Sequence, residues 1–181
     1  MEGGELVQII KKDRFISQLW GGLYSQDNFP PEMVRGHLYI VNADNFDEKG
    51  SHWFVISTVR PKCVDFLCSY RSRLASMPNI SKILKNSKLK IHQFGRRFQG
   101  SHSTSCGAFA LFFCWSISRG INSPRAIENH FFNISHPDPY KFDMLVVTAI
   151  RHLLPVGKSL EKLVYDTDFI KIQEEEEKNN E

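Results

Sequence analysis

The chain lacks the cysteine pairs and the long apolar run that would place it in several common classes. Its four cysteines include no C-x-x-C pair, so neither a zinc knuckle nor a thioredoxin-type motif is supported. No run of 18 apolar residues occurs, so we expect no membrane span. The opening Met1–Glu5 has neither the basic start nor the apolar core of a signal peptide. We therefore expect an intracellular protein whose cysteines are free thiols.

Length and composition indicate one folded unit with a charged tail. The chain has 181 residues, of which 41% are apolar and 14 are phenylalanine, so it can bury one sizeable core. Its net charge is +3, although residues 171–181 hold five glutamates and only two lysines. We expect a single α+β domain over residues 1–170, followed by an acidic, disordered tail over residues 171–181.

The spacing of apolar residues predicts both helices and strands. Helical spacing occurs at 5–20 with a break near Asp13, at 72–84 with an interruption at Pro78, and at 106–118, 125–132 and 142–154. Strands are expected at 37–42, 53–59 and 63–67, as an antiparallel meander, and within 89–98, whereas 23–31 is expected to be a loop. The segment 106–118 has almost no polar face, which predicts a central buried helix.

A candidate nucleophile stands at the start of this apolar helix. Cys106 is followed by Gly107, and a helix N-terminus is expected to lower the pKa of a thiol placed there. A thiol that cleaves an amide also needs a base and oxyanion donors. His52, at the start of a predicted strand, is the candidate base, and Gln99 is a candidate oxyanion donor. Taken singly, each of these residues could equally be an ordinary core, surface or loop residue, so the hypothesis depends on their combination.

The combination resembles a known protease family. Cys106 and Gly107 before a buried helix, Gln99 seven positions earlier, and His52 followed by Trp53 on a strand are similar to the adenovirus maturation protease (adenain) family. The wider group includes the Ulp proteases specific for SUMO and NEDD8. The resemblance covers residues 5–118. Ulp proteases typically have a six-residue step and an aspartate before the cysteine, so the seven-residue step here favours the viral type, including relatives in Maverick/Polinton virus-like elements.

The resemblance implies a fold, an activity and a set of roles. The fold would be an α+β cysteine-protease fold in which the cysteine-bearing helix packs on a small, mostly antiparallel sheet. The activity would be that of a cofactor-free, metal-free thiol endopeptidase that cleaves virion precursor proteins near glycine-containing sites. Cys106 would be the nucleophile, His52 the base and Gln99 the oxyanion donor. The protein would act as a monomer in the host nucleus or cytoplasm and be packaged in the virion.

DNA is the further partner that the resemblance implies, because adenain is activated on DNA and by a viral peptide that forms a disulfide. Basic side chains that could contact phosphates follow one another at Lys82, Lys85, Lys88, Lys90, Arg96 and Arg97. The alternative is an ordinary solvated helix face. Lys88 stands where the family has the cysteine of the disulfide, so a covalent peptide link is not expected.

The third member of the catalytic set is the open question at this point. The family has an aspartate or glutamate near the end of the strand after the histidine strand, and here that position is Cys68. The nearest carboxylate is Asp65, three residues earlier, which faces the other side of a regular strand unless a bulge intervenes. Either Asp65 orients the imidazole, or the site is a Cys-His dyad, or it is inactive. The alternative functions are a Ulp-like deconjugating protease and a non-enzymatic module that binds nucleic acid or capsid protein.

Overall fold

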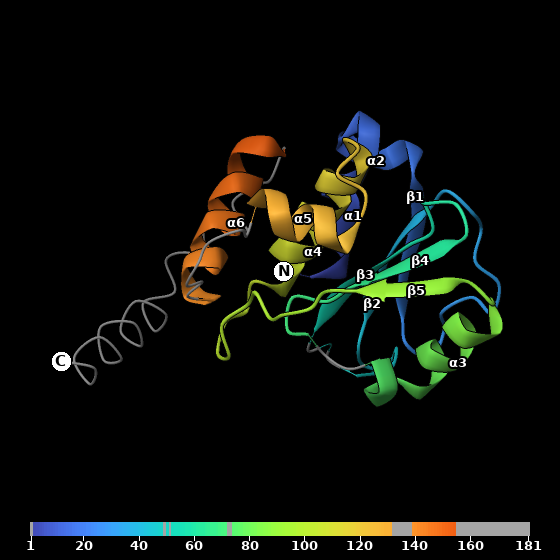
Figure 1. Cartoon of the computed structure of the whole chain (residues 1–181). Helices are drawn as coiled ribbons and strands as arrows, with labels where there is room; N and C mark the ends of the chain where they lie inside the picture. Colours follow the sequence, from blue (N-terminus) through green and yellow to red (C-terminus); the bar gives the residue numbers. More distant parts are fainter. Residues whose placement is uncertain (1, 49, 51, 72–73, 132–138, 155–181) are drawn as a thin grey trace.

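The computed structural model describes residues 2–48, 50, 52–71, 74–131 and 139–154. It is a mixed α+β fold in which five strands form one sheet and helices cover both faces (Figure 1). The strands are β1 (Trp20–Ser25), β2 (Leu38–Asn42), β3 (Trp53–Ser57), β4 (Cys63–Leu67) and β5 (Lys90–Gln93). The helices are α1 (Gly3–Lys12), α2 (Arg14–Gln18), α3 (Pro78–Asn86), α4 (Cys106–Ser118), α5 (Pro124–Phe131) and α6 (Pro139–Leu153), with a 3-10 turn at Leu74–Ser76. The acidic tail predicted for residues 171–181 lies outside the described residues.

The sheet contains parallel as well as antiparallel pairs. Its strand order is β1-β2-β3-β4-β5, and the predicted meander of β2, β3 and β4 is antiparallel as expected. However, β1 pairs with β2 and β4 pairs with β5 in parallel, so the expectation of a mostly antiparallel sheet is wrong. Both parallel pairs are joined by long connections, residues 26–37 and the segment that contains α3, and such crossovers let the chain return in the same direction.

Strand β1 was not expected, because its glycines suggested only the end of a helix. Gly21 lies against the ring of Tyr39, where a Cβ atom would come within 2.5 Å of the ring carbon Cε1. Gly22 has a φ of +131°, a conformation that side chains rarely adopt. These glycines therefore allow an edge strand to lie close over an aromatic ring, and part of the segment predicted as the loop 23–31 is β-structure.

The residues at their N-termini explain where α2 and α3 begin. The predicted break at Asp13 is confirmed, because the Asp13 carboxylate accepts hydrogen bonds from the backbone N–H groups of Phe15 and Ile16 and thereby caps α2. Pro78 begins α3 and does not interrupt a longer helix, so that expectation was wrong. Proline suits the first helical turn, where its missing N–H has no partner to lose.

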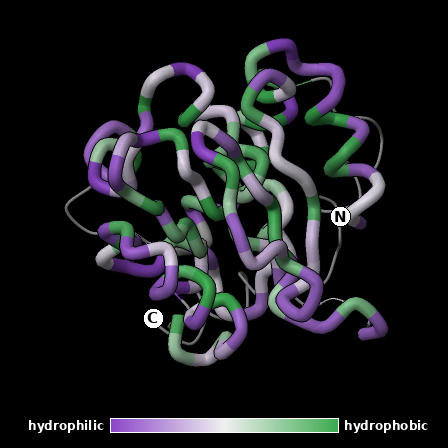
Figure 2. Tube along the Cα trace, turned by 90° about the vertical axis from the view of Figure 1, so that its right-hand side faces the viewer, coloured by the Kyte–Doolittle hydropathy of each residue, from purple (hydrophilic) through white to green (hydrophobic). Residues whose placement is uncertain are grey.

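Two apolar layers lie on opposite faces of the sheet. The first packs α4 and parts of α1, α2, α5 and α6 against one face, and the second packs α3 against the other. Helix α4 is buried along almost its whole length, as expected from its lack of a polar face. By contrast, α1 has one buried face, and in Figure 2 the helix that follows the N label alternates between hydrophobic and hydrophilic segments. The sheet and α4 therefore form the rigid frame that carries the candidate site.

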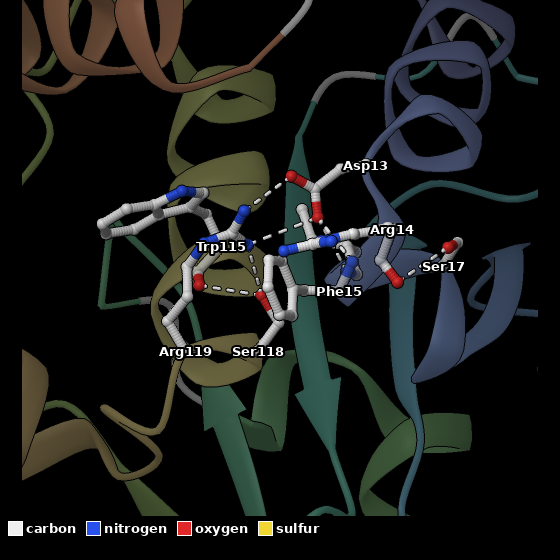
Figure 3. Close-up of polar contacts among 8 residues, drawn as sticks. Asp13, Arg14, Phe15, Ser17, Trp115, Ser118 and Arg119 are labelled. Atoms are coloured by element: carbon white, nitrogen blue, oxygen red, sulfur yellow. Dashed lines mark hydrogen bonds and ion pairs between the residues drawn. The ribbon is translucent and has the colours of Figure 1, made fainter.

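One ion pair joins the N-terminal helices to the end of α4. The Arg119 guanidinium donates to both carboxylate oxygens of Asp13, at 3.3 and 2.7 Å. The same guanidinium lies over the rings of Phe15 and Trp115 (Figure 3), 4.8 and 5.0 Å from their centroids. Burial alone would raise the pKa of Asp13, but the bonds from Arg119 and from backbone N–H groups outweigh it and lower the pKa below its usual 3.8.

Replacing Asp13 should therefore destabilise the fold in a pH-dependent way. Asp13→Asn keeps a capping oxygen but loses the charge, and it should lower the free energy of unfolding by about 1 kcal/mol at pH 7. Asp13→Ala loses the cap as well and should cost about 2 kcal/mol. Because the folded-state pKa is depressed, the stabilisation is present above the unfolded-state value near 3.8 and is lost as pH falls below it. Urea denaturation at pH 7 and pH 3 checks this, and a wild-type advantage over Asp13→Asn that persists undiminished at pH 3 would contradict it.

Candidate active site

Cys106 is the first residue of α4 and lies beside the start of β3. Its thiol sulfur accepts a hydrogen bond from the backbone N–H of Trp53 and is also close to the N–H of Gly107. The side chain is buried, with a residue exposure of 8%. Burial raises the pKa of Cys106 above its usual value, and the N–H groups oppose this only in part. The expectation that the helix terminus would lower this pKa is therefore wrong, because desolvation outweighs the donors.

His52 directly precedes Trp53, so the strand that touches Cys106 also carries the candidate base. The imidazole is buried at 7% exposure, and burial lowers the pKa of His52 to about 4, although the charge of Asp44 raises it slightly. Its Nε2 atom lies 3.1 Å from the sulfur of Cys68. Its Nδ1 atom has no hydrogen-bond partner among the described residues. The ring is therefore neutral at pH 7, with one nitrogen facing Cys68.

Cys68 thus occupies the place beside the imidazole where an acid was sought. Asp65 does not, and its proposed role as the partner of His52 is wrong. Asp65 lies opposite Ser57 at the far end of β3, which is about 16 Å along the strand from His52 at 3.3 Å per residue. Both carboxylate oxygens of Asp65 accept hydrogen bonds from Arg60. The strand is regular there, so no bulge turns Asp65 toward the site.

Gln99 is fully buried and holds its amide in a network of three neighbours. The Ser69 hydroxyl donates to its side-chain oxygen at 2.6 Å. Its Nε2 donates to the carbonyl oxygen of Ser103 at 2.9 Å and to the hydroxyl of Tyr70 at 3.1 Å. The amide is therefore fixed next to the loop that leads to Cys106, and in this arrangement both of its N–H groups are engaged within the protein.

Tyr70 is a site residue that the sequence analysis missed. Its ring lies against His52 with a centroid separation of 4.7 Å, and its hydroxyl donates to the carbonyl of Ser103 at 2.5 Å. Burial, with a smaller contribution from the nearby Cys106, raises the pKa of Tyr70 to about 12, so the hydroxyl stays protonated. The antiparallel register of β3 and β4 pairs Val55 with Leu67, and continuing it places residue 70 opposite residue 52. That register was the available signal.

The predicted basic cluster divides into two groups. All four lysines are exposed: Lys82 and Lys85 on α3, Lys88 in the turn that follows α3, and Lys90 at the start of β5. The two arginines are instead engaged with the residues around the site. The Arg97 guanidinium donates to the carbonyl of Gln99 and lies 5.1 Å from the ring centroid of Tyr70, and Arg96 lies over Phe98. The lysines therefore remain the candidate phosphate-binding surface.

Comparison with known proteins leaves the family open, because no family model and no curated protein matches this sequence. Within the described part of the chain, no cluster of three or more histidine, cysteine, aspartate or glutamate side chains could hold a metal ion. In the same residues, no helix is long and apolar enough to cross a bilayer. The interpretation of the site accordingly rests on its geometry.

The geometry brings together a thiol, an imidazole, a primary amide and a phenol at one end of the sheet. The Cys106 thiol and the His52 imidazole are both neutral at pH 7, because burial raises the thiol pKa and lowers the imidazole pKa. Among the described residues, no carboxylate is hydrogen-bonded to the imidazole in the way that stabilises an imidazolium in a triad. Cys68 offers only a weak donor or acceptor in that place.

Replacing Cys68 by aspartate tests this description of the electrostatics. In Cys68→Asp, a carboxylate beside Nε2 should raise the pKa of His52 from about 4 by about 1 to 3, because it favours the charged ring. Cys68→Asn has a similar shape without the charge and should leave that pKa unchanged. The measurement is a proton NMR titration of the His52 ring, and equal pKa values in both variants would contradict the assignment of Cys68 to this place.

Proposed function

We propose that this protein is a thiol endopeptidase of the adenain type that processes structural precursor proteins of a virus or virus-like element. The observation that carries the proposal is the position of Cys106 at the start of a buried helix, where its sulfur accepts a hydrogen bond from the Trp53 N–H. His52 is the residue directly before Trp53 in the sequence. Its α4-on-sheet arrangement is compatible with the α+β cysteine-protease fold that the sequence resembles. Substrate class and site of action follow from the resemblance.

The chemistry assigns one role to each group. His52 takes the proton from Cys106, whose sulfur attacks the carbonyl carbon of the scissile amide. The Cys106 backbone N–H and the Gln99 amide stabilise the oxyanion. The C–N bond then breaks, the amine leaves with the proton from the imidazolium, and water hydrolyses the thioester. Since His52 faces Cys68 and Gln99 faces Ser103 and Tyr70, substrate binding must turn both side chains toward the reacting atoms.

Activity should depend on Cys106 and not on thiols elsewhere. Cys106→Ala should lower the rate of peptide cleavage by at least about 10³-fold while the fold is retained, because the nucleophile is removed. The matched control is Cys63→Ser, since Cys63 also lies near a histidine, 3.7 Å from His92 Nε2, but on a different part of the sheet. Cleavage would be followed by mass spectrometry on a mixed-sequence peptide library, and full activity of Cys106→Ala would overturn the proposal.

The Ulp-like alternative is distinguished by its substrate. The seven-residue step from Gln99 to Cys106 argues against it. A SUMO or NEDD8 fusion added to the same assay would be cut after the ubiquitin-like module if that alternative holds, whereas the adenain-type proposal expects the fusion to stay intact and the peptide library to be cut.

A binding module without catalysis is the second candidate, favoured by Cys68 in place of an acid and by the exposed lysines on α3 and in the turn after it. DNA binding through these lysines is proposed for either function. Changing Lys82, Lys85 and Lys88 to glutamine should weaken binding to a DNA duplex and reduce its logarithmic salt slope by up to about 3, because three phosphate contacts are lost.

Fluorescence anisotropy across a salt series measures this effect. The control changes Lys11 and Lys12 to glutamine, since these residues end α1 on the opposite face of the sheet. An unchanged slope in the triple-lysine variant, or an equal loss in the control, would show that α3 and the turn after it are not the DNA-binding surface.

A further inference from the structure

A buried carboxylate from α6 holds the loop that connects Gln99 to Cys106. Asp143 is only 2% exposed. One of its oxygens accepts the backbone N–H of Gly100 at 2.9 Å. The other accepts the hydroxyls of Ser103 and Ser105 at 2.9 and 2.5 Å. Three donors from one short loop thus converge on a single side chain that is distant in sequence.

Such a carboxylate is costly to bury, since a charged group loses its hydration. Burial raises the pKa of Asp143, and the bonds from Ser105, Gly100 and Ser103 oppose this. An apolar residue in the same place would avoid the cost of burying a charge. A gain in stability therefore does not explain the carboxylate. Its three hydrogen bonds to the loop instead fix the position of that loop.

The hydrogen bond to Ser105 has a consequence for the N-terminus of α4. Ser105 is the N-cap residue, and a serine there usually accepts a backbone N–H from the first turn. Here its side chain makes no capping hydrogen bond. Its hydroxyl instead faces Asp143, to which it donates, and the hydroxyl oxygen of Ser103, which lies 2.5 Å away. The N–H groups of the first turn are left uncapped, and that of Gly107 is close to the sulfur of Cys106.

The same loop also holds the candidate oxyanion donor. The carbonyl of Ser103 accepts from the Gln99 amide and from Tyr70, while the hydroxyl of Ser103 donates to Asp143. A displacement of Ser103 would therefore move Gln99 and Tyr70 together. The Asp143 carboxylate is connected in this way to both ends of the Gln99–Cys106 segment.

We propose that Asp143 is a positioning residue of the peptidase. It keeps the Ser105 hydroxyl turned away from the N-terminus of α4, so that the first-turn N–H groups remain available to the Cys106 sulfur and to the oxyanion. It also fixes Gln99 through the hydrogen bonds of Ser103. The role in cleavage rests on the proposed function. The effect on the Cys106 thiol does not, because it can be measured without a substrate.

The test compares Asp143→Ala, Ser105→Ala and the double variant by the pH dependence of Cys106 alkylation with iodoacetamide. In Asp143→Ala the freed Ser105 hydroxyl should cap the helix and take an N–H from the sulfur, so the alkylation midpoint should shift to higher pH. Ser105→Ala should shift it little, and the double variant should recover part of the wild-type profile, because no hydroxyl remains to form the cap. Asp143→Asn, which can accept from Gly100 and donate to the serines, should lie between wild type and Asp143→Ala.

A second readout and a matched control separate positioning from general destabilisation. In the peptide assay, Asp143→Ala should lower kcat by about 10- to 100-fold with little change in KM, because the reacting groups are displaced while the substrate still binds. The control is Glu128→Ala, which removes another helix-to-loop bond, from the Gly95 N–H at 2.8 Å, and should change neither readout. If Asp143→Ala unfolds, the intermediate profile of Asp143→Asn decides.

An alkylation profile of Asp143→Ala and Asp143→Asn identical to wild type would overturn the proposal, as would a double variant no better than Asp143→Ala. If wild type cuts no peptide yet the alkylation profiles shift as described, the proposed function fails while the positioning of the thiol by Asp143 stands. A normal kcat in Asp143→Ala, with peptide cleavage by wild type, would also overturn the role in cleavage.

Discussion

The burial of α4 is the constraint on which the rest of this structure depends. Because the helix has almost no polar face, it must lie between the sheet and the other helices. Its first residue, Cys106, is consequently buried with it, and the uncapped N–H groups of its first turn lie in a low-dielectric environment, where they interact more strongly than in water. A reactive thiol placed there gains nearby donors but loses hydration, and the raised pKa of Cys106 shows that the loss prevails at rest.

Burial also explains why the titratable groups of the site are neutral and why its polar side chains form hydrogen bonds with one another. His52 is neutral because of desolvation, and its ring faces Cys68. The Gln99 amide donates its hydrogen bonds to Ser103 and Tyr70. Buried polar groups must find partners, and without a substrate the partners are other site residues. Among the described residues of the site, Nδ1 of His52 is a buried atom without a hydrogen-bond partner. This nitrogen is therefore open to a hydrogen bond from a bound molecule.

Local pattern was a sound guide to the elements whose apolar spacing is regular, and a poor guide where one residue had two uses. The meander, the break at Asp13 and the extent of α4 were predicted and are confirmed. Gly21 and Pro78 were misinterpreted, since a glycine can end a helix or admit an aromatic ring, and a proline can interrupt a helix or begin one. The parallel pairing of β1 and β5 depends on long crossovers, which leave no local pattern.

The sequence by itself determined that Cys106 begins a buried helix, that His52 directly precedes a strand and that no carboxylate stands at residue 68, because these follow from residue identity and short-range periodicity. Only the tertiary structure decided which groups meet. Register set Tyr70 against His52 and removed Asp65 from the site. The packing of α6 on α4 brought Asp143 to a loop 38 to 43 residues away in sequence. Such meetings depend on how separate elements pack, and the packing of distant segments is not encoded in any single stretch of chain.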